Sequence, residues 1–149
     1  MLINILDLIR IKDWLKNIII FFPLIFSGQL SSFNENSNVL FIFIIFCLSA
    51  SIIYIINDIL DSDSDKLHPI KSITKPIASN RISKQLAFKI LILVVLLLII
   101  LLLFNKDILF HVLAYFIINL SYNFLLKNLA VVDIITLSLG YVVRLDAGS

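Results

Sequence analysis

The sequence predicts an all-α fold, a polytopic bundle of about five transmembrane helices preceded by an amphipathic helix at the membrane interface. The 149 residues are 60% hydrophobic and include only three glycines and three prolines. Their mean hydropathy is +1.07. A soluble domain of this size cannot cover so much apolar surface, so lipid must solvate most of it. We therefore expect residues 1–149 to form a single membrane domain.

The N-terminal segment predicts an interfacial helix that leads into the first span. Residues 2–16 alternate apolar and charged side chains, as in helices that lie in the headgroup region. Trp14 and Lys16 are residue types that anchor a helix at this depth. The apolar run of residues 18–26 is short and contains Pro23, so the first span is expected to begin within the preceding helix.

Four further apolar segments predict the remaining spans, and each approaches the roughly 20 residues that cross a bilayer. They are residues 39–57, 85–104, 108–126 and 129–145. The last carries Arg144 and is followed by Asp146, and the sequence breaks off at Ser149, which leads us to expect that the chain is the N-terminal part of a longer fold. Ionisable residues inside a span are functional or paired by default, but a structural role for Asp133 and Arg144 fits the sequence equally well.

The distribution of charge predicts the orientation of the bundle. Of the twelve Lys and Arg residues, all but Lys106 and Arg144 fall on one predicted side, together with the N-terminus and the loop after residue 57. The positive-inside rule makes that side cytoplasmic and predicts a multi-pass protein of the inner (cytoplasmic) membrane. The sequence contains no basic aromatic patch, so no nucleic-acid partner is expected. The single Cys47 excludes a disulfide framework.

An acidic cluster directly follows the second predicted span. On a helix that advances about 100° per residue, one face carries Asn57, Asp58, Asp61 and Asp65, whereas Asp63 points away. Each carboxylate at mid-membrane costs about 2.5–3.5 kcal/mol, so the cluster is expected at the membrane edge. Acids also oppose the dipole at a helix C-terminus, where a bound cation compensates them. Hard oxygen ligands predict Mg²⁺ bound by Asp58, Asp61 and Asp65; a solubilising helix end is the simpler alternative.

Basic residues follow the acidic cluster and predict phosphate binding. Lys71 and Lys75 lie in the same loop as the acids and can contact phosphate oxygens while Mg²⁺ bridges the phosphates to the carboxylates. Lys16 is a second candidate, although a lysine at an interface also extends to the headgroups by default. Tyr122 and Lys127 lie at a predicted helix end, where aromatic and basic residues also occur for topological reasons.

These motifs resemble a known family. The pattern Asn57-Asp58-x-x-Asp61-x-x-x-Asp65 is similar to the first aspartate-rich motif of the UbiA superfamily of intramembrane prenyltransferases. Three more stretches resemble its decaprenyl-phosphate phosphoribosyltransferase branch, and the similarity runs from about residue 10 to the end. They are Trp14-Leu15-Lys16-Asn17, the segment from His68-Pro69 to Ser79, and the segment from Tyr122 to Lys127.

The resemblance implies an all-helical fold of about nine spans around a central cavity, of which five lie in this chain. It also implies a second aspartate-rich motif, which these 149 residues lack. The implied reaction transfers 5-phosphoribose from phosphoribosyl pyrophosphate to a polyprenyl phosphate, of the decaprenyl type, in the bilayer. Mg²⁺ on the pyrophosphate is then held by the three aspartates and oriented by Asn57. The implied substrate-binding residues are Lys16, Lys71, Lys75, Tyr122 and Lys127.

Two other functions remain open. The first is a UbiA-type prenyltransferase that moves a prenyl group from its diphosphate to an aromatic or other acceptor. The second is a non-catalytic membrane fragment or subunit. The sequence also departs from the family pattern at Ile11, where proline is usual, at Lys75, where arginine is common, and at Asn80, where glycine is common. Lys75 keeps the charge but loses the two-pronged guanidinium geometry.

Overall fold

The computed structural model describes the backbone of residues 1–28, 33–123 and 130–149, and the side chains of all of these except residues 33–36 and 130–133. The described residues are helical and contain no strand, which confirms the predicted all-α class. In chain order the helices are α1 (Leu2–Leu8), the 3₁₀ helix η1 (Ile11–Phe21), α2 (Phe22–Phe26), α3 (Phe33–Leu60), α4 (Ser62–Leu67), α5 (Lys71–Thr74), α6 (Lys84–Phe104), α7 (Leu109–Ser121) and α8 (Ala130–Ala147).

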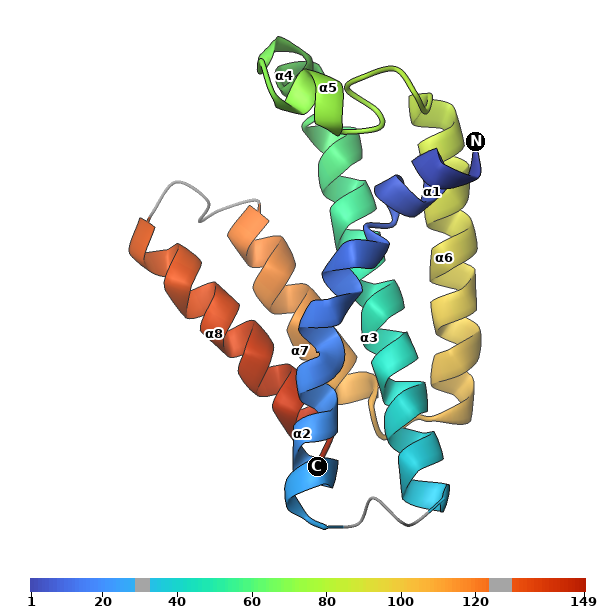
Figure 1. Cartoon of the computed structure of the whole chain (residues 1–149), viewed down its shortest axis with the longest axis vertical. Helices are drawn as coiled ribbons and strands as arrows, with labels where there is room; N and C mark the ends of the chain where they lie inside the picture. The colour runs from blue at the N-terminus through green and yellow to red at the C-terminus, as the bar shows by residue number, and fades with distance from the viewer. Residues whose placement is uncertain (29–32, 124–129) are drawn as a thin grey trace.

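Helix α3 is the centre of the bundle (Figure 1). It packs against α6 on one side and against η1 and α7 on the others, while α8 packs on α7 and η1. The short helices α4 and α5 lie together at one end of α3 (Figure 1), and the N-terminal helix α1 packs against α3. The polar loop that contains the predicted site is therefore folded back onto the end of the central helix.

Two helices are long and apolar enough to cross a membrane among the described residues, namely Ser37–Leu60 and Lys84–Phe104. They differ in how much of their surface the bundle covers, since 67% of the first apolar segment is buried and only 17% of the second. Helix α6 accordingly exposes a continuous set of large aliphatic side chains, which suits contact with lipid. Helix α7 is a shorter apolar helix of 13 residues.

The N-terminal segment is not the single helix expected over residues 2–16. Helix α1 ends at Leu8, and Arg10 adopts a left-handed backbone conformation with φ 51° before η1 begins. This region of φ/ψ space is strained for a residue with a Cβ atom and is usually retained where the surrounding contacts require it. The turn changes the chain direction and places Arg10 against α3.

The helix that carries the acidic cluster also breaks, so the prediction of one continuous helical face from residue 57 to 65 is wrong. Helix α3 ends at Leu60, and Asp61 precedes α4 with ψ 0°. The hydroxyl of Ser62 donates to the carbonyl oxygen of Ile59 at 2.9 Å, and that of Ser64 donates to the carbonyl oxygen of Asp61 at 2.8 Å. Such local side-chain hydrogen bonds compete with regular helix formation and explain the bend.

A buried hydrogen-bonded group joins η1 to α3. The indole N–H of Trp14 donates to Ser51 Oγ at 3.0 Å, and the Ser51 hydroxyl donates to the carbonyl oxygen of Ile9 at 2.7 Å. Trp14 is half-buried and directs its polar atom toward α3. This contact fixes the position of the N-terminal segment on the central helix.

Ser51→Ala is expected to lower the stability of the fold, because it leaves the Trp14 N–H and the Ile9 carbonyl without this buried partner. An unsatisfied buried polar group costs about 1–3 kcal/mol. The thermal unfolding midpoint in detergent should therefore fall. Ser64→Ala is the control, since its exposed hydroxyl bonds only within a local turn. Equal midpoints for the two variants would contradict the structural role of Ser51.

Candidate active site

Two carboxylates are buried where α3 meets α4. Asp58, in the last turn of α3, is 1% exposed, and Asp65, in α4, is 2% exposed. Aspartates are almost never fully buried unless they are paired with a cation or a metal. These two side chains therefore depend on the positive charges placed around them.

Lys75 bridges the two buried carboxylates. Its Nζ lies 2.9 Å from Asp58 Oδ1 and 2.6 Å from Asp65 Oδ2, and Lys71 Nζ lies 3.2 Å from the other oxygen of Asp65. Lys71 begins α5 and Lys75 follows its last residue, so this short helix delivers both amino groups to the end of α3. The structure thus brings together four of the predicted site residues.

The bridge keeps both partners ionised. Burial acts to raise the pKa of Asp65, but hydrogen bonds from Lys75 and Lys71 outweigh it and lower that pKa from its ordinary value of 3.8. Burial acts to lower the pKa of Lys75, but hydrogen bonds to Asp65 and Asp58 raise it above 10.5. The stability contributed by Asp65 is thus present above pH 3.8 and declines as the pH falls below it.

Arg10 is a third cation at this site, and the sequence analysis did not single it out. Its Nη2 lies 3.4 Å from Asp58 Oδ1, and its guanidinium lies 4.5 Å from the centre of the Tyr54 ring. Asp13 lies 3.9 Å from the same guanidinium. The second oxygen of Asp58, Oδ2, is buried and forms no hydrogen bond with the described residues. A buried acceptor without a partner favours a cation or a donor at that position.

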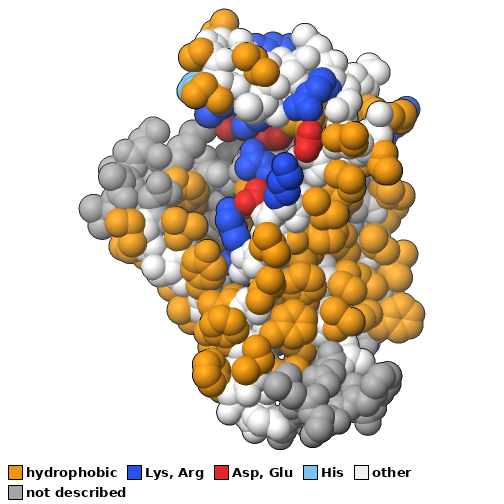
Figure 2. All heavy atoms as spheres, viewed as in Figure 1, with side chains coloured by type: hydrophobic (Ala, Val, Ile, Leu, Met, Phe, Trp, Pro, Cys, Tyr) orange, Lys and Arg blue, Asp and Glu red, His pale blue; other side chains and the backbone are white. Residues whose placement is uncertain are grey.

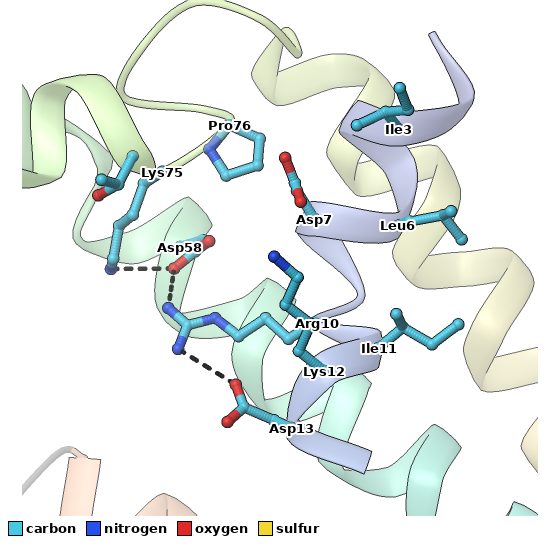
Figure 3. A pocket seen from close by; sticks show the side chains of 11 residues that line it. Ile3, Leu6, Asp7, Arg10, Ile11, Lys12, Asp13, Asp58, Lys75 and Pro76 are labelled. Carbon is cyan, nitrogen blue, oxygen red and sulfur yellow. Dashed lines mark hydrogen bonds and ion pairs between the residues drawn. The ribbon is translucent and has the colours of Figure 1, made fainter. Parts of the chain in front are cut away.

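A pocket of about 490 Å³ opens beside Asp58 and Lys75 (Figure 3). Charged side chains from η1, α3 and the loop after α5 line one part of it, and Ile3 and Leu6 of α1 line another. Figure 2 shows the basic and acidic side chains gathered in a hollow on a face that is otherwise largely apolar. The pocket therefore combines a charged end with an apolar wall.

Three other predicted site residues line a second pocket. Asn57 precedes Asp58 on α3 and lines a cavity of about 190 Å³, together with Lys16 of η1 and Tyr122, which follows α7. Arg144 of α8 lines the same cavity. Asp61 is half-buried and lines neither pocket. Lys127 lies outside the described residues.

The carboxylates fit a divalent cation in part. Among the described residues, no three His, Cys, Asp or Glu side chains are close enough together to hold a metal. The ligand set of Asp58, Asp61 and Asp65 therefore stays a prediction. However, Asp58 and Asp65 already share one cationic group, and no described residue forms a hydrogen bond with Asp58 Oδ2. Mg²⁺ is commonly bound by one or two carboxylates with water and substrate phosphates, which this arrangement allows.

The fold and this motif define an integral membrane transferase family. A family model described as the UbiA prenyltransferase family matches residues 18–148, and the chain belongs to that family. The match covers every helix from η1 onward in whole or in part. It confirms the resemblance inferred from the aspartate motif.

Curated relatives give a finer comparison. The chain is 31% identical over 145 residues to decaprenyl-phosphate phosphoribosyltransferase of Mycolicibacterium smegmatis, covering 94% of this chain and 45% of that protein. It is 30% identical to the protein of the same name from Corynebacterium glutamicum, covering 43% of it. Nodulation protein NoeC of Azorhizobium caulinodans is 28% identical over 141 residues. The chain spans less than half the length of these relatives.

Lys75→Met is expected to destabilise the protein, because it leaves two buried carboxylates with only their weaker contacts to Arg10 and Lys71. Removing one partner of a buried ion pair costs about 3–5 kcal/mol, and the remaining contacts place the loss near the lower value. Thermal unfolding in detergent measures it.

Lys66→Met is the matched control for this substitution. Lys66 pairs at 3.7 Å with Asp63, whose side chain is 76% exposed. Exposed pairs contribute about 0–1 kcal/mol, so this variant should unfold near the wild-type temperature. A midpoint for Lys75→Met as high as that of the control would show that the bridge does not stabilise the site.

Proposed function

We propose that this protein takes part in the transfer of 5-phosphoribose from phosphoribosyl pyrophosphate to a polyprenyl phosphate, of the decaprenyl type, within the membrane. The observation that carries the proposal is the pair of buried carboxylates bridged by Lys75. That arrangement provides hard oxygen ligands and phosphate-binding lysines at the same place. The names of two relatives at about 30% identity support the choice of donor and acceptor.

The proposed topology has five spans. Helices α3 and α6 are two of them, η1 with α2 forms another, and α7 and α8 are the remaining two. The N-terminus and the acidic motif are assigned to the cytoplasmic side of the inner membrane, because basic residues concentrate there. This orientation gives phosphoribosyl pyrophosphate direct access to the pocket beside Asp58.

The aspartates are proposed to hold Mg²⁺ and the lysines to hold phosphate. Asp58 and Asp65, with Asp61 as a third ligand, would bind the ion, which neutralises charge on the departing pyrophosphate. Asn57 is assigned to orient this group. Lys71 and Lys75 would exchange their carboxylate contacts for pyrophosphate oxygens, which are better charged partners once a cation occupies the acids. Lys16, Tyr122 and Lys127 are the remaining candidates for phosphate contacts.

The nucleophile requires little activation. The phosphate of the acceptor lipid is ionised at neutral pH, so its oxygen can attack the anomeric carbon without a strong base. The protein then contributes mainly by positioning the two anionic substrates and by stabilising the charge that develops on the leaving group. Cationic side chains near both substrates serve that purpose.

A prenyl transfer is the second candidate, and the apolar wall of the larger pocket favours it. Ile3, Leu6 and Ile11 line that pocket close to Asp58 and Lys75, where a prenyl chain attached to a diphosphate can pack. Label that enters lipid from ribose-labelled phosphoribosyl pyrophosphate distinguishes the two reactions. Label transferred only from a prenyl diphosphate would replace the first proposal with the second.

Asp65→Asn is expected to reduce phosphoribosyl transfer by about 100-fold or more in the natural protein reconstituted in nanodiscs, since it weakens the ligands of an essential ion. Asp63→Asn is the control from the same motif, because Asp63 is exposed and contacts Lys84 at 2.9 Å on the surface. It should retain activity close to the wild type. Turnover that is unchanged in Asp65→Asn, or that needs no divalent cation, would contradict the proposal.

A further inference from the structure

Arg144 is a buried cation with neutral partners. It is 9% exposed, and its Nε donates to Asn17 Oδ1 at 2.6 Å. Its Nη1 donates to the carbonyl oxygen of Gly140 at 2.9 Å, and its Nη2 donates to the hydroxyl of Tyr115 at 2.9 Å. Tyr115 and Tyr141 also face the guanidinium with their rings, at 4.7 Å and 5.6 Å from the ring centres.

No described carboxylate forms an ion pair with Arg144. Asp146 is two residues away in sequence but lies 3.1 Å from His111. Three hydrogen bonds use three of the five N–H groups of the guanidinium. A buried charge without a counter-charge is costly, and in a membrane helix it commonly marks a ligand site. The neutral cage therefore holds Arg144 in place without neutralising it.

The pocket around Arg144 carries many polar and basic side chains beside the apolar Ile53 and Leu137. All four tyrosines of the chain line it, together with three asparagines, one threonine and the amino group of Lys16. Its lining contains no acidic residue among those described. Its volume of about 190 Å³ is less than half that of the larger pocket, at about 490 Å³. These features fit a phosphate group.

The two pockets meet α3 at consecutive residues. Asn57 lines the Arg144 pocket and Asp58 lines the larger one, because neighbouring residues on a helix point about 100° apart. Asp13 connects them, since it contacts Arg10 at 3.9 Å and Lys16 at 2.6 Å. A series of ion pairs thus runs from the carboxylate site to the edge of the basic pocket.

We propose that Arg144, with Lys16, binds the phosphate of the lipid acceptor, while the donor pyrophosphate binds separately at Asp58 and Lys75. This assignment rests on the proposed phosphoribosyl transfer. No described carboxylate lines the Arg144 pocket to hold a metal ion. The pocket therefore suits the acceptor phosphate, which is proposed to bind without Mg²⁺. It also adjoins α8, whose outward side chains Ile134, Ile135 and Val142 are exposed and apolar. A prenyl tail leaving the pocket along α8 meets apolar surface.

With the two substrates in separate pockets, the acceptor phosphate acts as the nucleophile and the donor pyrophosphate as the leaving group. An oxygen of the acceptor phosphate forms a bond to the anomeric carbon as the bond from that carbon to the pyrophosphate oxygen breaks. The pyrophosphate departs with the electron pair, and no oxidant or reductant is required. Arg144 acts by placing the attacking phosphate, so its neutralisation should weaken acceptor binding and leave donor binding unchanged.

Asn17→Asp tests the inference without removing the arginine. The substitution preserves shape and places a carboxylate oxygen where Asn17 Oδ1 lies, 2.6 Å from Arg144 Nε, at the cost of the hydrogen bond from Asn17 Nδ2 to Cys47 Sγ. The new ion pair should keep or raise the thermal unfolding midpoint. The affinity for radiolabelled farnesyl phosphate, measured on the natural protein in phosphatidylcholine nanodiscs, should fall at least about tenfold because the added charge repels the ligand. Lys16→Gln, at a half-exposed position, should lower it less.

Asn105→Asp is the matched control, since it adds the same charge at the end of α6 and lines neither of these pockets. Farnesol and inorganic phosphate separate the contributions of the tail and the phosphate. Unchanged farnesyl phosphate affinity in folded Asn17→Asp would overturn the inference, and so would equal affinity for inorganic phosphate. If Asn17→Asp loses farnesyl phosphate binding and the wild-type protein shows no phosphoribosyl transfer, the anion site is supported and the proposed function is contradicted.

Discussion

The ammonium group of Lys75, shared by two buried carboxylates, is the contact on which the polar end of this protein depends. It joins α3 to α4 and ties the segment after α5 to both. Arg10 brings the N-terminal segment to the same carboxylate of Asp58. In an otherwise apolar bundle, removing that cation exposes two negative charges to a low-dielectric environment. The fold therefore brings carboxylates and cationic side chains together at one site, as the binding of a metal ion with a phosphate group requires.

The apolar helices and the polar site impose opposite demands, and α3 meets both. Its middle is buried against α6, α7 and η1, whereas its last turn carries Asn57 and Asp58 into separate pockets. Placing the acids at the helix end avoids the cost of charge at mid-membrane. Arg144 shows another solution, because neutral acceptors and aromatic rings surround its buried charge.

Apolar segments of the sequence were sufficient to predict α3 and α6. The length and composition of an apolar segment can be read directly from the sequence, without knowledge of tertiary contacts. The motif also placed Asp58 and Asp65 near Lys71 and Lys75. Helical periodicity did not predict the bend at Asp61, since serine hydroxyls there compete with the backbone.

The sequence did not single out Arg10, and it left a functional and a structural role for Arg144 equally open, because the partners of both residues are distant in sequence. Arg10 and Asp58 are separated by 48 positions, and Arg144 and Asn17 by 127.

The most direct measurement is a crystal structure of the protein with Mn²⁺ and phosphoribosyl pyrophosphate, using anomalous scattering to locate the ion. We expect the ion at about 2.1 Å from oxygens of Asp58 and Asp65, with Lys75 moved onto the pyrophosphate. An ion bound elsewhere, or Lys75 still between the carboxylates when the donor is bound, would contradict the account.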